Sequence, residues 1–366
     1  MKVLTIITRG DAIGGAQTHV IALNKLLLKN GHEVLVAFGG KNRGVLGDWL
    51  ADESIPFQLV KCLKREISPL FDLLAFIELI LLVRKYNPQV IALHSTKAGI
   101  LGRMLKLVFN IPIILTVHGW SFSPGIPLFL AKIYELIERF FARLLDKIIV
   151  VSDFDYNLAV QKSIGLLSQF VIIHNGIDLS SFSRNKSNLE VVNLVMIARF
   201  DDQKDHATLI HACQRISGIM LHLLGDGPKL QETKRLVRDL GMNEKVNFWG
   251  YTKDVSKALQ TADIFLLISN WEGFPISTLE AMNASLPLLV SDVGGACEAI
   301  IEGENGYCIP RADREVLSQK IIMLRDDLSL RLSMGARSKE IVSDKFSLDS
   351  MYNATVAEYQ VLIKQK

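Results

Sequence analysis

Cysteine and proline are scarce in this chain of 366 residues, which contains 4 cysteines, 10 prolines and only 8% aromatic residues. The cysteines form no C-x-x-C motif, which argues against a zinc site and a redox motif and fits a reducing cytosolic environment. They are widely spaced, at Cys62, Cys213, Cys297 and Cys308. With 49% hydrophobic and 22% charged residues, the composition excludes a disordered, collagenous or disulfide-stapled protein. The length predicts two domains, each with its own core.

Long hydrophobic runs are also missing. Residues 68–83 are the nearest approach to a membrane span, with 12 apolar residues out of 16, but Asp72 and Glu78 interrupt them. This segment is too short and too charged to cross a bilayer. Residues 1–8 lack the pattern of an export signal, so we expect a cytoplasmic protein. The mean hydropathy of +0.27 is high for a soluble enzyme, which leaves attachment to a membrane surface open.

The small net charge of +3 is unevenly distributed along the chain. Residues 1–185 contain 20 Lys and Arg against 14 Asp and Glu, whereas the remainder contains 21 against 24. Residues 61–147 alone hold 12 basic and 6 acidic side chains, so this window accounts for the positive excess. Such a window favours an anionic partner. Nucleic-acid binding lacks any motif beyond this modest basicity.

Apolar runs typical of buried strands alternate with helical patterns in both halves of the chain. Runs of Val, Ile and Leu that are buried on both faces predict parallel sheets flanked by helices, which is a doubly wound α/β fold. The predicted strands are 3–8, 32–38, 57–60, 90–94, 113–117, 148–151 and 171–173, then 193–197, 220–224, 246–249, 264–268 and 288–290. The polar stretch 178–188 reads as a linker. We therefore predict domains at 1–180 and 190–346, with a last helix at 347–366.

Polar residues that follow strands form the strongest functional signal. Residues 269–275, Ser-Asn-Trp-Glu-Gly-Phe-Pro, lie between a predicted strand and a helix that contains Glu280. Backbone amides at the start of this helix can hold anionic oxygens, and Glu280 can accept hydrogen bonds from hydroxyl groups. Taken alone, Glu272 and Glu280 also fit ordinary helix-dipole and solvent-exposed positions. The surrounding motifs decide between the two interpretations.

These motifs resemble those of the retaining glycosyltransferases of family 4, which have the GT-B fold, and the resemblance spans nearly the whole chain. They are Gly14-Gly15, His118-Gly119, Val151-Ser152, Asn175-Gly176-Ile177-Asp178, Ala198-Arg199-Phe200 with Lys204, Gly225-Asp226-Gly227-Pro228, Glu272-Gly273-Phe274-Pro275, Glu280-Ala281-Met282 and Ser291-Asp292-Val293-Gly294-Gly295. The resemblance implies two Rossmann-like domains that face each other across a cleft, with the last helix returning to the N-terminal domain. It also implies that a sugar moves from a nucleotide diphosphate donor with retention of configuration.

The resemblance also implies a role for each matching residue. Arg199 and Lys204 contact the donor diphosphate and stabilise the leaving group, Glu280 binds the ribose, and Glu272 and His118 contact the donor sugar. The implied donor-binding set further includes Gly14, Gly15, Gly227, Phe274, Pro275 and Ile276. We expect front-face displacement, because no second catalytic carboxylate is evident as a nucleophile.

Gly14 and Gly15 lie between a strand and a helix without forming G-x-G-x-x-G or a P-loop motif. A tight turn with positive φ is the structural alternative to phosphate binding, and the two can coexist. Trp120 and Phe122 are predicted to form the acceptor pocket, and His94 also ends a strand and can reach it. His19 and His174 carry no functional prediction.

Two further motifs have structural interpretations. Asp153-Phe154-Asp155 resembles the metal-binding D-x-D of another glycosyltransferase fold, but its position after Ser152 favours a helix cap. We therefore expect no metal and no other cofactor. Ser285 stands where the family commonly has glycine, which suggests an altered turn.

The acceptor is the least defined partner. Helical segments in the basic window can lie on an anionic membrane surface, although core-facing stripes with solvated charges are the commoner case. We hypothesise that a UDP-linked hexose or N-acetylhexosamine is added to a polyprenyl-diphosphate-linked saccharide at the inner face of a bacterial membrane, in surface polysaccharide synthesis. A nucleotide-sugar epimerase of GT-B architecture and a non-catalytic nucleotide-sugar-binding partner subunit are the alternatives.

Overall fold

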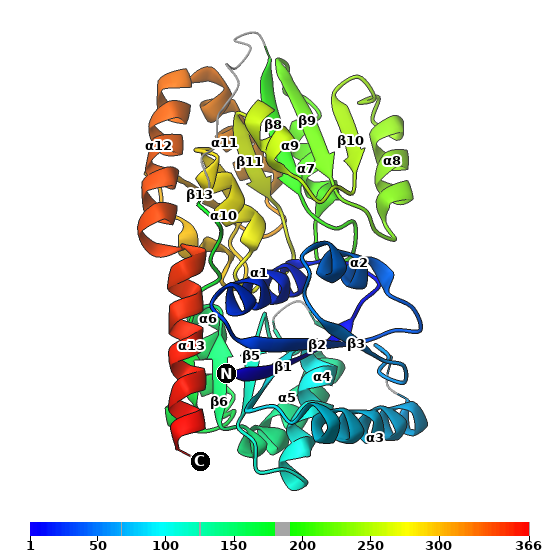
Figure 1. Ribbon diagram of the computed structural model, residues 1–366. Coiled ribbons are helices and arrows are strands. Elements are labelled where there is room, and N and C mark those ends of the chain that lie inside the picture. Colours follow the sequence, from blue (N-terminus) through cyan, green and yellow to red (C-terminus); the bar gives the residue numbers. More distant parts are fainter. Residues whose placement is uncertain (67, 124–125, 180–190, 366) are drawn as a thin grey trace. The chain divides into compact units, whose positions relative to one another are not determined.

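A computed structural model of the chain describes residues 1–66, 68–123, 126–179 and 191–365. The chain divides into two compact units, one formed by Met1–Asn175 with Leu348–Lys366 and the other by Gly176–Ser347. Each unit contains one parallel sheet flanked by helices, which confirms the predicted α/β class (Figure 1). The predicted domain limits at 180 and 190, and most of the predicted linker, lie outside the described residues.

The first unit is built on seven parallel strands in the order β3-β2-β1-β4-β5-β6-β7. The strands are β1 (Lys2–Arg9), β2 (Glu33–Gly39), β3 (Phe57–Val60), β4 (Val90–His94), β5 (Ile113–Val117), β6 (Lys147–Val150) and β7 (Phe170–Ile172). The helices are α1 (Gly15–Lys29), α2 (Gly44–Asp52), α3 (Pro69–Tyr86), α4 (Thr96–Met104), α5 (Leu128–Phe141), α6 (Asp153–Gln161) and α13 (Leu348–Lys364), with short 3-10 helices η1 (Leu105–Leu107), η2 (Ala142–Leu144) and η3 (Leu167–Gln169).

Helices cover both faces of this sheet because its strands are apolar on both faces. Along β1, Leu4 and Ile6 belong to one core cluster, whereas Val3 and Ile7 belong to the other. Alternate residues of a strand point to opposite faces, so the two clusters are the two layers between sheet and helices. The second cluster also contains Met351, Tyr352, Val356 and Tyr359. The last helix, α13, is therefore part of the core of the first unit, and Figure 1 shows it alongside this sheet.

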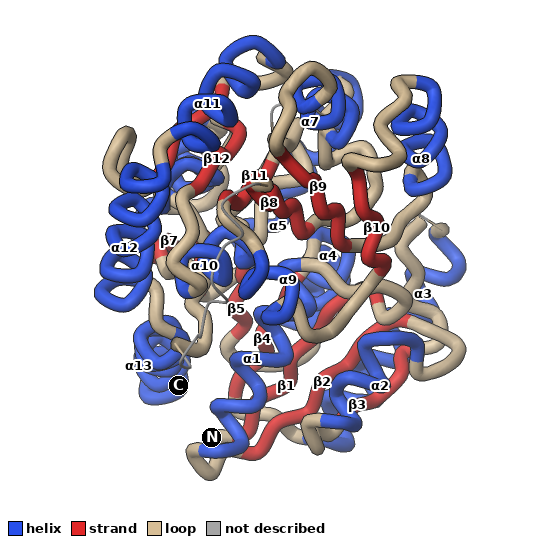
Figure 2. The backbone as a smooth tube through the Cα atoms, turned by 90° about the horizontal axis from the view of Figure 1, so that it is seen from above, coloured by secondary structure: helices blue, strands red, loops and turns tan. Residues whose placement is uncertain are grey.

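The second unit repeats the architecture with six parallel strands in the order β10-β9-β8-β11-β12-β13 (Figure 2). The strands are β8 (Val192–Ile197), β9 (Ile219–Leu224), β10 (Val246–Gly250), β11 (Ile264–Leu267), β12 (Leu288–Ser291) and β13 (Gly306–Ile309). The helices are α7 (His206–Cys213), α8 (Leu230–Asp239), α9 (Ser256–Thr261), α10 (Ile276–Asn283), α11 (Arg314–Asp326) and α12 (Leu328–Lys345), with the 3-10 helix η4 (Ala296–Ala299).

Neither strand β13 nor the disulfide formed by its cysteine was predicted. Cys308 on β13 forms a disulfide with Cys297 on η4, and the two Cα atoms are 6.1 Å apart. The disulfide does not fit the reducing environment expected from the sequence, because the argument against a redox motif rested on C-x-x-C spacing and this pair is 11 residues apart. The two cysteines meet because β13 pairs with β12 and returns the chain beside the loop in which Cys297 lies. Cys62 and Cys213 are free thiols.

The turn at Ser285 also differs from the prediction. Ser285 has φ +57°, the left-handed conformation that glycine usually supplies after a helix. The expectation of an altered turn is wrong, because serine adopts the glycine-like conformation. The position is closely packed, since a Cβ added to Gly335 of α12 would lie 2.1 Å from the Ser285 carbonyl oxygen.

Across the described ranges, each helix is too short or too polar to cross a membrane. This agrees with the prediction for residues 68–83, which form most of α3.

Candidate functional site

The predicted residues lie at the carboxyl ends of the central strands in each unit. In the first sheet, Gly14 follows β1 and His94 ends β4, and in the second, Arg199 follows β8 and Glu272 follows β11. In both sheets these two strands are neighbours from which the chain continues in opposite directions. Doubly wound sheets bind their ligands outside the carboxyl ends of strands at this point of reversal.

Backbone pairing between two loops of the second unit places Lys204 next to Glu272. Lys204 forms an antiparallel bridge with Ser269, and the backbone NH of Asn270 donates to the Gln203 carbonyl oxygen at 2.7 Å. The Glu272 carboxylate is 6% exposed and accepts hydrogen bonds from three side chains. These are Lys204 Nζ, Ser269 Oγ at 2.6 Å and Gln203 Nε2 at 3.0 Å. Gln203 and Ser269 had not been predicted as site residues, although Gln203 directly precedes Lys204 and Ser269 is the first residue of the motif 269–275.

The loop after β12 supports Glu272 from the backbone side. Gly294 has φ +60°, and a Cβ there would lie 2.0 Å from the Glu272 carbonyl oxygen, so only glycine fits. Ser291 Oγ accepts a hydrogen bond of 3.0 Å from the backbone NH of Ser269. The conformation of the Glu272 loop therefore depends on its close contact with the end of β12 and the loop that follows this strand.

Arg199 is the second cation at this edge of the sheet. Its Nε donates to Asp201 Oδ2 at 3.1 Å, and the side chain is half-buried. Both predicted diphosphate-binding cations are paired with carboxylates of the same unit. Gly227 is required to be glycine for a steric reason. A Cβ atom on this residue would lie 2.4 Å from the carbonyl oxygen of Phe200.

Helix α10 begins directly after the Glu272 loop. Pro275 is its N-cap residue and Ile276 its first residue. Among the described residues no side chain caps this end, so its first-turn NH groups can bind an anion. Phe274 is buried against Phe346, with ring centroids 5.1 Å apart. The structure therefore gives Phe274 a packing role, because its ring is withdrawn into the core.

Glu280 lies one turn further along α10 and is partly buried. Burial disfavours the charged carboxylate and raises the pKa of Glu280 to about 7. Without a ligand this group is thus close to half protonated at neutral pH.

In the first unit, the two glycines before α1 are not required by backbone strain. Gly14 is the N-cap with φ −149°, and neither Gly14 nor Gly15 has a positive φ. The alternative of a tight turn with positive φ is therefore wrong. A Cβ added to Gly15 would meet no atom within 4 Å, and one on Gly14 would meet only Gln17 Oε1, at 3.5 Å. Open space beside a helix N-terminus suits close approach of a ligand.

Three histidines meet at the carboxyl ends of β4 and β5. His94 Nδ1 lies 3.0 Å from His118 Nε2, and the His19 ring from α1 lies 4.7 Å from the His118 ring. His19 Nδ1 is 2.9 Å from Asn175 Oδ1. Burial lowers the pKa of His19 to about 4 and the pKa values of His94 and His118 well below their usual range, so all three are neutral at pH 7. His19 and Asn175 had not been predicted to belong to a site.

The residues proposed for an acceptor pocket are placed in the core. Trp120 and Phe122 are each 5% exposed and stack with ring centroids 5.1 Å apart. Trp120 Nε1 donates to the Asp155 carbonyl oxygen at 2.9 Å. The prediction that both rings line a pocket is corrected, because packing and this hydrogen bond already use them. The capping interpretation of Asp155 is confirmed, since Ser152 accepts from its backbone NH at 3.0 Å at the start of α6.

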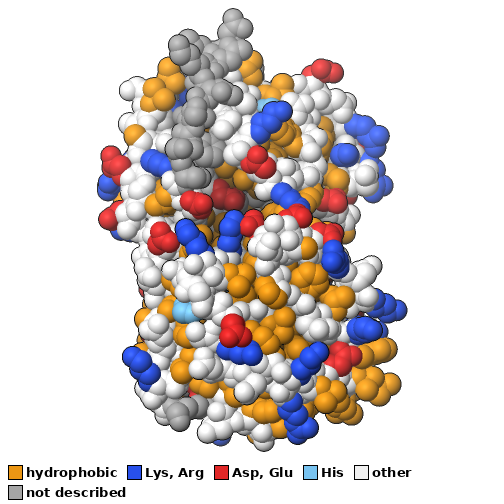
Figure 3. All heavy atoms as spheres, in the orientation of Figure 1, with side chains coloured by type: hydrophobic (Ala, Val, Ile, Leu, Met, Phe, Trp, Pro, Cys, Tyr) orange, Lys and Arg blue, Asp and Glu red, His pale blue; other side chains and the backbone are white. Residues whose placement is uncertain are grey.

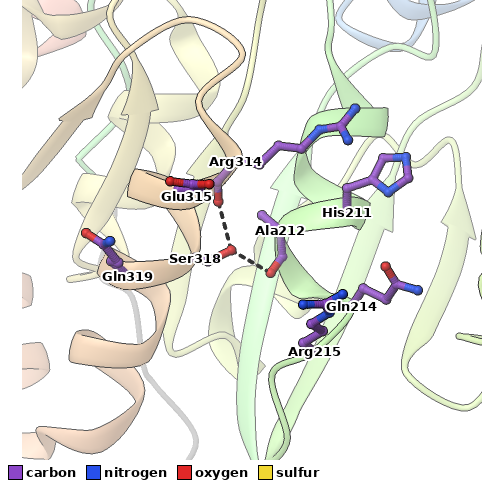
Figure 4. A pocket seen from close by; sticks show the side chains of 8 residues that line it. All are labelled: His211, Ala212, Gln214, Arg215, Arg314, Glu315, Ser318 and Gln319. Carbon is purple, nitrogen blue, oxygen red and sulfur yellow. Dashed lines mark hydrogen bonds between the residues drawn. The ribbon is translucent and has the colours of Figure 1, made fainter.

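Two cavities open on the second unit. One has a volume of about 530 Å³ and is lined by Lys204, His206, Lys229 and Asn270, among others, so it reaches the Lys204 loop. The other, of about 420 Å³, lies between α7 and α11 (Figure 4). Figure 4 shows Ser318 Oγ hydrogen-bonded to the carbonyl oxygens of Ala212 and Arg314, which ties the two helices together. The predicted site residues do not line this second cavity.

The chain matches two family models and several known proteins. Residues 180–341 match the glycosyl transferases group 1, and residues 13–181 match Glycosyltransferase Family 4. The UDP-Gal:alpha-D-GlcNAc-diphosphoundecaprenol alpha-1,3-galactosyltransferase of Escherichia coli is 27% identical over 320 residues, which cover 82% of each chain. The O-antigen biosynthesis glycosyltransferase WbnH of Escherichia coli is 28% identical over 357 residues, 97% of this chain and 98% of that protein. The structure of HepE from Anabaena in complex with UDP and glucose has a TM-score of 0.87 at 19% identity, covering 98% and 99% of the two chains, and confirms the predicted GT-B fold.

Replacing Gly15 by alanine should separate stability from binding. Alanine favours helix more than glycine, so the free energy of unfolding should stay unchanged or rise by up to about 1 kcal/mol. The added methyl group occupies the open space, so we expect affinity for a nucleotide sugar to fall about tenfold or more. Denaturant unfolding and titration calorimetry measure the two effects. Undiminished affinity in Gly15→Ala would show that this space is not used by the ligand.

Replacing Glu280 by glutamine should raise stability and weaken nucleotide binding. The folded-state pKa of about 7 lies above the ordinary value of 4.5, so the associated stability is fully present below about pH 4.5 and is lost as pH rises through about 7. Glu280→Gln should therefore be more stable than the wild type at about pH 8, by roughly 2 kcal/mol. Urea unfolding from about pH 5 to about 9 tests this prediction. A stability difference that does not change with pH would contradict it.

Proposed function

Since the chain belongs to the group 1 and family 4 glycosyltransferases, we propose that it transfers a hexose or N-acetylhexosamine from a UDP-linked donor to a lipid-linked saccharide. Relatives named for O-antigen and capsular polysaccharide biosynthesis support a role in bacterial surface polysaccharide synthesis. The relative that is 27% identical uses, by its name, UDP-Gal and a diphosphoundecaprenol-linked sugar, which favours UDP and a lipid diphosphate for this chain.

The paired cations at the reversal point of the second sheet are the observation on which this proposal depends. Arg199 and Lys204 follow β8, and Glu272 follows the neighbouring strand β11. An incoming diphosphate offers both cations stronger charge-assisted hydrogen bonds than a single carboxylate does. When the donor binds, Arg199 and Lys204 therefore exchange their carboxylate partners, Asp201 and Glu272, for phosphate oxygens. The Glu280 carboxylate accepts hydrogen bonds from the ribose hydroxyl groups.

The same cations stabilise charge on the departing diphosphate as the bond to the sugar breaks. His118, which is neutral and lies at the end of β5, contacts the donor sugar without adding a charge that would oppose a cationic sugar carbon. No metal or other cofactor enters this scheme.

The state of Glu272 bears on how configuration would be retained. Its carboxylate accepts hydrogen bonds from Ser269 and Gln203, which can stay in place when Lys204 turns to the diphosphate, and this makes it a weak nucleophile. A covalent glycosyl intermediate on Glu272 is therefore disfavoured, so front-face attack by the acceptor is the proposed route to a retained product. The leaving phosphate then takes the acceptor proton.

A donor screen tests transfer directly. We expect release of nucleoside diphosphate from one UDP-sugar in the presence of a detergent-solubilised polyprenyl-diphosphate saccharide, and an α-linked product from an α-linked donor by NMR. Lys204→Ala should lower kcat/KM by about 100-fold or more, because one leaving-group cation is lost, whereas Lys257→Ala, which removes an exposed cation of α9, should not. An inverted product would rule out retention. An altered free nucleotide sugar would indicate an epimerase, and tight binding without turnover a non-catalytic partner.

The acceptor side of the proposal includes contact with a membrane surface. Helix α5 has a wide exposed apolar face, with Phe129 and Phe140 76% and 73% exposed. Leu128, Leu130, Ile133 and Leu136 are exposed as well, and so are Leu70, Phe71, Leu73, Leu74, Ile77 and Leu81 of α3. Figure 3 shows hydrophobic side chains gathered over the part of the first unit where Figure 1 places α3. Exposed apolar surface of this extent marks an interaction site.

Helix α5 is attached through a buried ion pair and through partly buried Ala131 and Tyr134, which pack against the core. Its one fully buried side chain in the described residues is Glu138, which receives a 2.8 Å ion pair from Arg103 of α4. The apolar face is thus left outward, beside the exposed cations Lys132, Arg139 and Arg143. Apolar side chains flanked by cations suit a helix that lies in the interface of an anionic bilayer.

Flotation with liposomes tests membrane contact. The wild type should bind vesicles containing phosphatidylglycerol at low salt, and the double variant Phe129→Gln/Phe140→Gln should bind more weakly because apolar surface is lost. The matched control is Ile322→Gln/Leu332→Gln, which alters two exposed apolar residues of the second unit. Equal binding by both double variants would contradict a docking role for α5. Wild-type protein that stays in the soluble fraction would reject membrane contact altogether.

A further inference from the structure

The three histidines of the first unit contain more unsatisfied nitrogen atoms than a structural cluster needs. His19 Nε2, His94 Nε2 and His118 Nδ1 are buried atoms without a hydrogen-bond partner among the described residues. One ring nitrogen of each histidine lies within 4.8 Å of one from each of the others. Buried polar atoms nearly always have partners, so the unpartnered Nε2 of His19 in this cluster of rings points to a missing ligand.

Asn175 fixes the tautomer of His19. The amide oxygen of Asn175 only accepts hydrogen bonds, so His19 Nδ1 carries the proton in the 2.9 Å contact. Neutral His19 consequently presents Nε2 as an unprotonated, unpartnered acceptor. An oxygen that accepts a hydrogen bond from the other ring nitrogen is typical of histidines that bind metal.

The contact between His94 and His118 has the spacing of two metal ligands. His94 Nδ1 and His118 Nε2 are 3.0 Å apart and share one proton. Two nitrogens bound at 2.0–2.1 Å to a tetrahedral zinc ion lie about 3.3 Å apart. A metal ion can therefore replace the shared proton with a small movement of the two rings. The displaced proton moves to the outer nitrogen of the same ring, so both imidazoles remain neutral.

We propose that His19 Nε2, His94 Nδ1 and His118 Nε2 bind one divalent ion of the zinc type. Three imidazole nitrogens suit zinc and its late first-row neighbours, whereas magnesium and calcium require oxygen ligands. His118 is the one partly exposed histidine of the three, so an ion can reach the cluster from its side. Because the imidazoles are neutral without metal, binding displaces no imidazole proton into solution.

Occupancy of this site has a consequence for transfer, which rests on the proposed function. The metal engages His118, the predicted contact of the donor sugar. Zinc at a concentration that fills the site should therefore inhibit the enzyme, and a chelator should restore activity.

The binding test uses the full chain without a histidine tag, treated with chelator and dialysed. Calorimetry with Zn²⁺ should show one site, and Co²⁺ should give the visible absorption of a tetrahedral nitrogen environment. His19→Gln should abolish this site. Asn175→Ala keeps all three imidazoles but removes the oxygen that accepts from His19 Nδ1, so it should weaken binding by about 10–100-fold. His211→Gln, which alters a histidine of the second unit outside the cluster, is the matched control and should bind like the wild type.

The outcomes separate the two proposals. No zinc binding to the wild type, or binding of equal strength in His19→Gln, overturns the metal site whatever the enzyme transfers. Circular dichroism and thermal unfolding verify that His19→Gln and Asn175→Ala are folded. If Asn175→Ala is folded and binds zinc as tightly as the wild type, the tautomer argument fails and the proposal with it. Zinc binding that persists in a protein without transferase activity leaves the site standing and rejects the proposed function.

Discussion

Parallel pairing of strands is the constraint on which both units depend. Because every strand in a parallel sheet ends at the same edge, the loops that follow neighbouring strands are brought together regardless of their separation in sequence. Lys204 and Gln203 thus meet Glu272 from 68 and 69 residues away. The helices that cover each sheet keep these loops close by filling both apolar faces. The chemistry of the molecule is confined to two strand edges, one in each unit.

The sequence was sufficient for the parts of this arrangement that repeat simple patterns. Continuous Val and Ile runs predicted the central strands, and the motif residues Arg199, Lys204 and Glu272 were placed correctly after strands. The short strand β13 was missed because Gly-Tyr-Cys-Ile has no distinctive apolar run. Phe274, Trp120 and Phe122 were predicted as ligand contacts, yet an aromatic residue after a strand satisfies a core just as well. Only the packing of each unit separates the two roles.

The remaining site residues that the sequence did not predict are brought together by contacts over long sequence distances. Asn175 meets His19 across 156 positions, so no local pattern joins them. Gln203 and Ser269 surround Glu272 only because two loops pair through their backbones. The result is a site in which acidic and basic groups neutralise each other before any ligand arrives. Such balance lowers the cost of keeping charged groups partly buried, and it makes ligand binding an exchange of partners.

Because the ion pair between Arg103 and Glu138 attaches α5 through its buried side, the packing of this helix does not depend on which residues form its outer face. Arg103 is fully buried and also donates to the Gly99 carbonyl oxygen at 2.8 Å, so the attachment is directional and fixes how the helix is rotated. The outward side chains contribute little to the stability of the unit. Mutations there can accumulate without unfolding the protein, which allows this surface to diversify between related enzymes while the sheet and its site stay unchanged.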